Sequence, residues 1–323
     1  PSTSRCYSED DFEAAGAVIQ EDVSPAQVIF GVKEVPIENL LPNKTYFFFS
    51  HTIKAQGYNM PLLDKLLELK IRMVDFETIR EAPVEGSTVQ PQRLVAFGRY
   101  AGIAGAFDFI RGVGEYLLEK KFQTPFVYLG SSYMYEDFEA MSDALRRVGK
   151  NISVSGLPKQ LSPIVFGVTG TGRCAQGSME VLEQLPHIKV APKELRAYLA
   201  DPSKHNNKQI VISQFTSADI AVPIDGKPFD KQRYYREPEN FKGIFHEYLD
   251  CVNFLVNNIY WEVKYPRILT KESYHAAVES GKCRLQGVSD ISADECGSIE
   301  FTSRFTSIEE PFLLYNTKTG QFK

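Results

Sequence analysis

Hydrophobic positions along this chain switch between two spacings, and the switches predict a mixed α/β protein. Short apolar runs rich in aromatic and β-branched residues are typical of buried strands, whereas apolar residues three and four apart are typical of helices. This pattern predicts strands at 28–32, 45–49, 71–76, 93–97, 164–168, 187–190, 209–213, 253–256 and 284–288. It predicts helices at 8–20, 59–69, 101–120 and 136–147. Polar or Pro- and Gly-containing stretches predict loops or linkers at 81–91, 124–135, 149–162 and 217–237.

The run from Pro163 to Gly177 carries the most informative motif. A buried apolar strand breaks into G-x-G-x-x-A at Gly170, Gly172 and Ala175, and a helical pattern follows. In such a turn the first two glycines allow a sharp bend and a close approach of a pyrophosphate, and the helix N-terminus faces the phosphate charge. The motif therefore indicates a dinucleotide site, with a purely structural glycine turn as the alternative.

Two series of alternating strands and helices in 323 residues favour two domains. The predicted fold is α/β, with two Rossmann-like domains and a cleft between them. We expect residues 1–155, with a return segment at 301–323, to form a substrate-side domain. Residues 156–300 are expected to form the dinucleotide-binding domain.

Composition narrows the class of protein. A hydrophobic content of 43% with 24% charged residues is ordinary for a globular protein, and a net charge of −5 argues against nucleic-acid binding. No apolar run approaches the length of a membrane span. The five cysteines form no C-x-x-C pair, so we expect neither a metal site nor a disulfide framework. A reducing compartment fits best. The chain begins at Pro1, so we expect it to be a piece of a longer protein.

Titratable residues follow the first two predicted strands. Lys33 and His51 each come directly after a buried run, where ligand clefts open in α/β sheets, and together they can serve as an acid-base pair. Lys54, Glu77 and Arg93 lie near strand ends or in the following loops, and Arg93 is suited to holding a carboxylate with two hydrogen bonds. The alternative is a capping lysine, a core histidine and ordinary surface charges.

In dinucleotide-binding domains, an Asp or Glu about 20 residues after the glycines holds the ribose 2′-hydroxyl of NAD. Here the strand ends in Val190, Ala191, Pro192 and Lys193, without an acid at its tip. This favours NADP, with Lys193 as a candidate for the 2′-phosphate.

The segments 31–36, 49–54 and 95–105, together with the turn at Gly170, resemble the alanine dehydrogenase and saccharopine dehydrogenase superfamily. The closer resemblance is to the lysine-ketoglutarate reductase half of bifunctional aminoadipic semialdehyde synthases. It rests on the segments 50–56, 169–172, 259–267 and 290–301, and it covers essentially the whole chain.

This resemblance implies an NADPH-dependent enzyme of lysine degradation that condenses L-lysine with 2-oxoglutarate and reduces the imine to saccharopine. It implies that Lys33 and His51 are the acid-base pair and that three residues shape the substrate site, namely Lys54, Glu77 and Arg93. The residues implied to bind NADP(H) are Gly170, Thr171, Gly172, Arg173, Asn257, Ile259, Tyr260 and Asp290.

The resemblance also implies fusion to a saccharopine dehydrogenase domain and a place in the mitochondrial matrix or the cytoplasm, and it leaves a homo-oligomer open. No nucleic-acid or membrane partner is expected. The alternatives are an NAD-linked, lysine-forming saccharopine dehydrogenase, an alanine dehydrogenase-like enzyme, or a non-catalytic nucleotide-binding regulatory module.

Overall fold

The computed structural model describes residues 7–53, 55, 57–82 and 91–322, and it divides into two compact units, residues 1–97 and 98–323. Each unit contains a parallel sheet, which confirms the predicted α/β fold class. The packing boundary after Phe97 lies earlier than the functional boundary expected near residue 155, and segment 301–323 is grouped with the second unit. The functional division into a substrate-side and a dinucleotide domain, with a cleft between them, stays a prediction.

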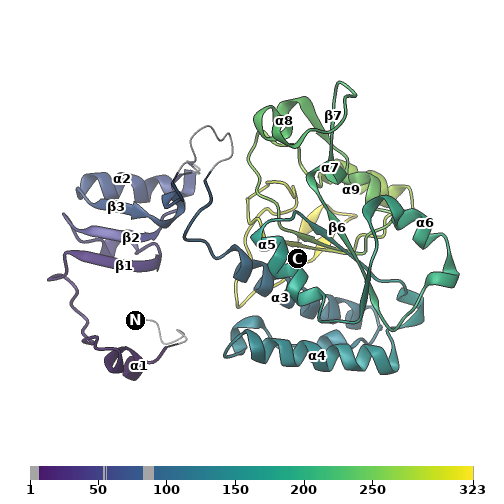
Figure 1. Ribbon diagram of the computed structural model, residues 1–323, viewed down its shortest axis with the longest axis horizontal. Coiled ribbons are helices and arrows are strands. Elements are labelled where there is room, and N and C mark those ends of the chain that lie inside the picture. Colours follow the sequence, from purple (N-terminus) through teal and green to yellow (C-terminus); the bar gives the residue numbers. More distant parts are fainter. Residues whose placement is uncertain (1–6, 54, 56, 83–90, 323) are drawn as a thin grey trace. The chain divides into compact units, whose positions relative to one another are not determined.

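In the first unit a three-stranded parallel sheet in the order β1-β2-β3 is covered on one face by a helix (Figure 1). Leu62 and Leu66 of that helix pack on Tyr46 and Phe48 of the central strand. The elements of this unit are α1 (Glu9–Ala14), β1 (Val28–Lys33), β2 (Thr45–Phe49), α2 (Met60–Glu68) and β3 (Arg72–Asp75).

In the second unit five parallel strands form a sheet in the order β10-β9-β4-β6-β5. The strands of this sheet are β4 (Val165–Thr169), β5 (His187–Lys189), β6 (Ile210–Phe215), β9 (Phe254–Asn257) and β10 (Gly287–Asp290). The helices are α3 (Gly98–Glu119), α4 (Phe138–Ser155), α5 (Arg173–Leu182), α6 (Leu195–Leu199), α7 (Ser217–Ile220), α8 (Lys231–Arg236) and α9 (Lys271–Glu279). Short antiparallel pairs join β7 (Ala221–Pro223) to β8 (Phe241–Gly243) and β11 (Tyr315–Asn316) to β12 (Gln321–Phe322).

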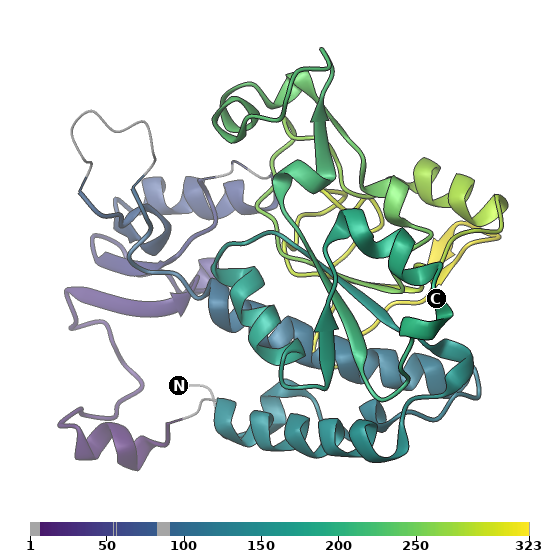
Figure 2. The same cartoon turned by 45° about the vertical axis from the view of Figure 1, so that its right-hand side comes forward.

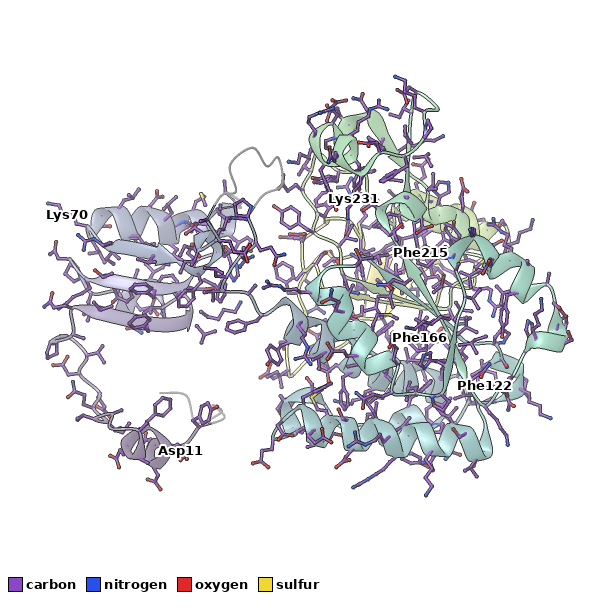
Figure 3. All side chains as sticks on the ribbon, viewed as in Figure 1. Asp11, Lys70, Phe122, Phe166, Phe215 and Lys231 are labelled. Carbon is purple, nitrogen blue, oxygen red and sulfur yellow. The ribbon has the colours of Figure 1, made fainter. Side chains whose placement is uncertain are left out.

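Alternate side chains of the central strands point to opposite faces of this sheet, as the two-residue period requires. Phe166 joins the core beneath α3, α4 and α5, and Phe215 joins the core on the other face with residues of α6. In Figure 2 the long helices α3 and α4 both lie on one side of this sheet. Figure 3 shows both rings inside the unit, whereas Lys231 lies on its surface. No helix in the described part of the chain is long and apolar enough to cross a membrane.

Close helix packing explains why α3 belongs with the second unit. A Cβ atom added to Gly102 of α3 would lie 1.9 Å from the carbonyl oxygen of Cys174, and one added to Gly177 of α5 would lie 2.0 Å from that of Arg99. Only glycine permits two helix backbones to come this near. The small residues of segment 101–105 therefore serve helix packing.

Several predicted elements were wrong at their ends. The first helix ends at Ala14 rather than near residue 20, because Gly16 adopts a φ of 92°. Helix α4 continues to Ser155, through part of the expected linker at 149–162. Gly149 within it packs against the chain at Gln184 and Pro186 instead of ending the helix.

Two predictions of element type were also wrong. Within the described residues no strand forms at 93–97, where Arg93 makes only an isolated antiparallel bridge to Arg80. The expected polar loop at 217–237 contains α7, β7 and α8. Its local polarity reflects short surface elements, whose few buried side chains, such as Tyr234, form a small separate core. Most of the loop expected at 81–91 lies outside the described residues.

Candidate functional site

In the first unit the two residues predicted as an acid-base pair are brought together. Lys33 ends β1 and His51 follows β2, and because these strands are parallel neighbours their carboxyl ends meet at one edge. Lys33 Nζ lies 3.1 Å from His51 Nε2.

Glu77 and Arg93 extend this pair into a chain of charged groups. Glu77 Oε2 lies 3.6 Å from His51 Nδ1, and Glu77 Oε1 lies 3.7 Å from Arg93 Nη1. The Glu77 side chain is only 14% exposed, and it comes from the short helical turn that follows β3. Glu77 Oε2 faces Nδ1 of the imidazole at a distance that is too long for a normal hydrogen bond. We call the four residues Lys33, His51, Glu77 and Arg93 the charged cluster.

Aromatic rings frame the charged cluster. The rings of Phe49 and His51 are stacked with centroids 6.3 Å apart, and the Arg93 guanidinium lies 5.8 Å from the Phe49 centroid. Phe76 and Phe97 pack edge-on against the same ring. This apolar wall restricts the orientations of both the imidazole and the guanidinium.

A buried hydrogen-bond network shapes the loop that carries His51. Asp75 accepts hydrogen bonds from Ser50 Oγ at 2.5 Å and from the backbone N–H of Glu77 at 2.8 Å. Asn59 Nδ2 donates to the backbone oxygen of His51 at 3.1 Å, and His51 has a φ of 54°. The sequence analysis missed Asp75 and Asn59 as site residues, although a polar residue at the end of a strand was the signal available. Lys54, predicted to bind substrate, lies outside the described residues.

The second unit presents the glycine turn at the end of β4, as the motif predicts. Gly170 has a φ of 88°, and its backbone N–H donates to Phe215 at the end of β6. Gly172 is the N-cap of α5, and a Cβ atom there would meet nothing within 4 Å. Arg173 is the first residue of α5, and Thr171 is exposed at the turn. Open space at a helix N-terminus fits a pyrophosphate.

The topological switch point of this sheet lies between the neighbouring strands β4 and β9, because the connections from these two strands lead to opposite sides. In open α/β sheets the ligand binds in the crevice at the switch point. There Asn257 Oδ1 accepts from Thr169 Oγ1 at 2.6 Å, while Asn257 Nδ2 donates to Asp290 Oδ1 at 2.9 Å. Asp290 also accepts from Ser292 and Thr302. Burial raises the pKa of the Asp290 carboxyl, although these hydrogen bonds oppose the shift. We call Thr169, Asn257 and Asp290 the buried network.

Ile259 and Tyr260 follow β9 directly beside the glycine turn, since the side chain of Ile259 lies 3.7 Å from the Cβ position of Gly170. Tyr260 is 65% exposed and donates its hydroxyl hydrogen bond to Glu262. Burial of the hydroxyl and the Glu262 carboxylate together raise the pKa of Tyr260. Ile259 therefore lies at the turn, and Tyr260 is the next residue along the chain.

Lys193 lines a groove of about 450 Å³ together with Ala191, Gln214 and Asp219. The strand that precedes it, β5, is not the neighbour of β4, because β6 lies between them. Asp219, shortly after the end of β6, was missed by the sequence analysis. Its carboxylate caps α7 by accepting from Thr216 at 2.6 and 2.8 Å.

Among the described residues no group of three or more His, Cys, Asp and Glu is placed to hold a metal ion.

Known proteins resemble this chain over its whole length. The family described as alanine dehydrogenase/PNT, N-terminal domain, matches residues 2–104. An alpha-aminoadipic semialdehyde synthase of Arabidopsis thaliana is 38% identical over 100% of this chain and 30% of its own length. A mitochondrial alpha-aminoadipic semialdehyde synthase of Bos taurus is 36% identical over 98% of this chain and 35% of its own length. This chain thus spans about a third of the length of these curated relatives.

Among solved structures, an L-alanine dehydrogenase covers 96% of this chain and 68% of its own length, with 11% sequence identity and a TM-score of 0.47.

Proposed function

The chain belongs to the alanine dehydrogenase/saccharopine dehydrogenase superfamily, and its whole length matches about a third of the aminoadipic semialdehyde synthases. We propose that it is the lysine-ketoglutarate reductase part of such a synthase. The proposed reaction is the NADPH-dependent condensation of L-lysine with 2-oxoglutarate to saccharopine. The observation that carries the proposal is the charged cluster, in which Lys33 Nζ and His51 Nε2 lie 3.1 Å apart. Fusion to a saccharopine dehydrogenase domain is part of this proposal.

The charged cluster supplies what imine formation requires. The amino group of lysine attacks the 2-oxo carbon only as the free base, and the carbinol oxygen leaves as water only after it gains a proton. His51 and Lys33 are close enough to pass a proton between them, so one can take the proton of the amine and return it to the departing oxygen. Glu77 Oε2 lies 3.6 Å from His51 Nδ1, where its negative charge would stabilise an imidazole that has taken up a proton.

Arg93 is assigned to hold a substrate carboxylate. Its guanidinium is 34% exposed and lies against Phe49, so it is oriented but open to a ligand. Arginine binds carboxylates through two parallel hydrogen bonds, which would fix the orientation of an acidic substrate. We assign Lys54 to the same carboxylate-binding role.

In the second unit, Gly170, Thr171, Gly172 and Arg173 are assigned to the pyrophosphate of the cofactor, with Asn257, Ile259, Tyr260 and Asp290 at the nicotinamide side. Gly172 fits this role because the space beside it is open. When bound, reduced nicotinamide supplies the hydride that reduces the C=N bond. The buried network holds the ends of β4, β9 and β10 together and so fixes the wall against which the ring would lie.

We propose NADPH rather than NADH as the cofactor. Lys193 and Ala191 line the groove at the end of β5, and within the described residues Lys193 takes part in no ion pair. Oδ2 of Asp219 in the same groove already accepts two hydrogen bonds from Thr216, so this oxygen is less available to a ribose hydroxyl. A 2′-phosphate would then meet the free cation of Lys193.

A steady-state assay of the full-length protein tests the function directly. Oxidation of NADPH is followed with L-lysine plus 2-oxoglutarate, with ammonia plus pyruvate, and with each substrate omitted. Saccharopine is identified by mass spectrometry. Turnover only with lysine plus 2-oxoglutarate is expected. Turnover with ammonia plus pyruvate would favour an alanine dehydrogenase. A strict requirement for NADH would favour the NAD-linked saccharopine dehydrogenase. Cofactor binding without any turnover would favour a regulatory module.

A further inference from the structure

The backbone of His51 lies in a conformation that the residue does not favour by itself. Its φ is 54°, in the left-handed region, where the Cβ atom crowds the following carbonyl oxygen. Such a conformation persists only where surrounding contacts fix it. Asn59 supplies one of these contacts, since its Nδ2 donates to the backbone oxygen of His51 at 3.1 Å. The position of the imidazole therefore depends on side chains outside the charged cluster.

The hydroxyl of Ser50 holds the chain on both sides of His51. Ser50 Oγ donates to Asp75 Oδ2 at 2.5 Å and accepts from the backbone N–H of Thr52 at 3.2 Å. Ser50 is only 1% exposed, so water has little access to these hydrogen bonds. The loop that carries the imidazole is thus tied to the end of β3 by the hydrogen bond between Ser50 and Asp75.

Asp75 uses its second oxygen for Glu77, the carboxylate neighbour of the imidazole. Asp75 Oδ1 accepts from the backbone N–H of Glu77 at 2.8 Å, and Asp75 is buried. A carboxylate has two acceptor oxygens and can accept both hydrogen bonds at once. One buried side chain therefore holds the residue before His51 and the backbone of Glu77.

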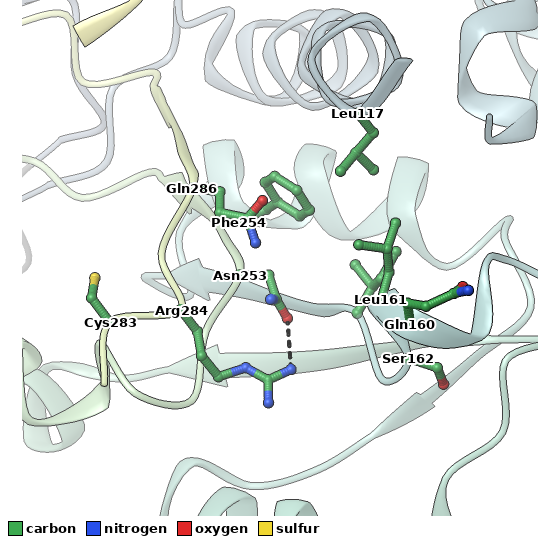
Figure 4. Close-up of a pocket in the computed structure, with 10 residues that line it drawn as sticks. Leu117, Gln160, Leu161, Ser162, Asn253, Phe254, Cys283, Arg284 and Gln286 are labelled. Carbon is green, nitrogen blue, oxygen red and sulfur yellow. Dashed lines mark hydrogen bonds between the residues drawn. The ribbon is translucent and has the colours of Figure 1, made fainter. Parts of the chain in front are cut away.

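Another buried network joins strand ends in the second unit, but it lies away from the predicted site residues. Asn253 Oδ1 accepts from the backbone N–H of Val165 at 2.9 Å and from Arg284 at 3.4 Å, beside a cavity of about 300 Å³ (Figure 4). These residues precede or begin β4, β9 and β10, at the edge of the sheet opposite the glycine turn. The Asp75 network differs, because its hydrogen bonds end on Glu77 itself and on the residue before His51.

We propose that Asp75 is a positioning residue for the proton transfers of the charged cluster. Through Ser50 and the backbone of Glu77, it sets the separation between the His51 imidazole and the Glu77 carboxylate, which is 3.6 Å from Nδ1 to Oε2. Displacing a catalytic group by about 1 Å can lower a rate about a hundredfold. This proposal deepens the proposed reductase function and rests on it, because it assigns Asp75 an effect on turnover.

Asp75→Ala tests this role when NADPH oxidation is followed with L-lysine plus 2-oxoglutarate. The variant should lower kcat by about 10–100-fold, change KM much less and leave the affinity for NADPH unchanged. Asp75→Asn should recover most of the lost kcat, because its amide oxygen can accept from Glu77 and its amide nitrogen can donate to Ser50 Oγ. Asp75→Asn as slow as Asp75→Ala contradicts the proposal, since turnover would then depend on the charge and not on the bridge.

Asp108 provides a matched control in the second unit. Its carboxylate likewise accepts from one backbone N–H and one serine hydroxyl, both of Ser132 and both at 2.7 Å. Asp108→Ala removes the same kinds of hydrogen bond, so it should lower the melting temperature without lowering kcat. An equal loss of kcat in Asp108→Ala and Asp75→Ala would be a general effect of lost stability, and it overturns the positioning role.

The ring nitrogen resonances of His51 separate this proposal from the proposed function. They are assigned by their absence from His51→Gln, and they report the surroundings of the imidazole whether or not the protein turns over these substrates. Asp75→Ala should shift them, and Asp108→Ala should not. Unchanged His51 resonances, or an unchanged kcat, in a folded Asp75→Ala overturn the proposal. An unaltered protein without turnover refutes the reductase function, and the resonances then decide whether Asp75 positions the ring.

If Asp75→Ala does not fold, Ser50→Ala decides. This variant removes the link to the residue before His51 and keeps the hydrogen bond between Asp75 and Glu77. It should lower kcat severalfold and shift the His51 resonances. A Ser50→Ala variant with unchanged kcat and unchanged resonances contradicts the proposal.

Discussion

The charged cluster of the first unit and the buried network of the second both gather polar side chains near the carboxyl ends of parallel strands, yet they are built differently. Arg93 joins the cluster from a segment that forms no strand. In the charged cluster the contacts are 3.1–3.7 Å long, and the side chains of His51 and Arg93 are about one-third exposed. In the buried network Thr169 and Asn257 are completely buried, and their hydrogen bonds measure 2.6–2.9 Å.

This difference teaches what each region can contribute. Long, accessible contacts between titratable groups allow a proton or a substrate to come between them, whereas short, buried hydrogen bonds fix the positions of strands. Changes in the charged cluster should therefore act on turnover, and changes around the glycine turn and the buried network should act on cofactor binding and stability.

The largest expected effect is on turnover. His51→Gln and Lys33→Met should each lower kcat/KM for lysine with 2-oxoglutarate by about 10²–10⁴-fold, because each removes a group that transfers protons. Their free energies of unfolding should change by no more than about 0.5 kcal/mol, as is usual for accessible positions. Lys65→Met, which removes an exposed lysine of α2 that pairs with Glu68, is the matched control and should not alter turnover. Unchanged turnover in both cluster variants would contradict the assigned roles.

The next effect separates two glycines of the second unit. Gly177→Ala should destabilise the protein by about 1–3 kcal/mol, because its methyl group would lie 2.0 Å from the backbone oxygen of Arg99. Gly172→Ala meets open space, so its stability should stay unchanged while its affinity for the cofactor falls. Urea unfolding and fluorescence titration with NADPH measure the two quantities. Equal stability of both variants would show that the helices do not require this close approach.

Cofactor preference gives a smaller effect. Ala191→Asp adds a carboxylate to the groove that Lys193 lines, and it should reduce the preference for NADPH over NADH by about tenfold, equal to about 1.4 kcal/mol. Lys193→Ala should reduce it in the same direction, and Lys227→Ala, at an exposed lysine bound to Asp225, is the control. Dissociation constants are compared at low salt, where charge effects are largest. Equal affinity of the unaltered protein for both cofactors would refute the proposed preference.

The smallest expected effect is on the pH dependence of stability. Burial raises the pKa of Asp290 in the folded protein above its value in the unfolded chain. The protonated carboxyl therefore contributes fully to the free energy of unfolding below the unfolded pKa, and this contribution is lost as the pH rises through the folded pKa. The side chain of Asp290→Asn cannot ionise. The free energy of unfolding of this variant, relative to the unaltered protein, should therefore increase as the pH rises from the unfolded to the folded pKa of Asp290. At the acidic end the variant should be about 1 kcal/mol less stable, since an amide cannot accept all the hydrogen bonds.

The exposed Asp11 provides the control for that experiment. Hydrogen bonds from Ser8 lower the pKa of Asp11, so its contribution to stability is lost as the pH falls, the opposite direction. Asp11→Asn should therefore become relatively more stable toward acidic pH. Melting temperatures from pH 3 to pH 7 measure both slopes. Parallel slopes for the two variants would contradict the assignment at Asp290.

The amino-acid sequence by itself determined the α/β class, most strands and the glycine turn, because these depend on local periodicity and on residues a few positions apart. It also placed Lys33 and His51 at the ends of successive strands. That prediction became a contact because the strands are parallel neighbours, which brings their carboxyl ends to one edge. The position of Arg93 near a strand end suggested a carboxylate-binding group, and the resemblance to a known superfamily added the expectation that Glu77 and Arg93 shape the substrate site.

Tertiary structure alone decided the features that depend on distant partners. The sheet order places β6 between β4 and β5, which brings Asp219 into the groove beside Lys193. The contact of Gly102 with Cys174 groups α3 with the second unit, and the missing partner strand leaves 93–97 without strand structure. Hydrogen bonds and packing between residues far apart in the chain follow from the order of the strands, and periodicity along the chain does not encode that order.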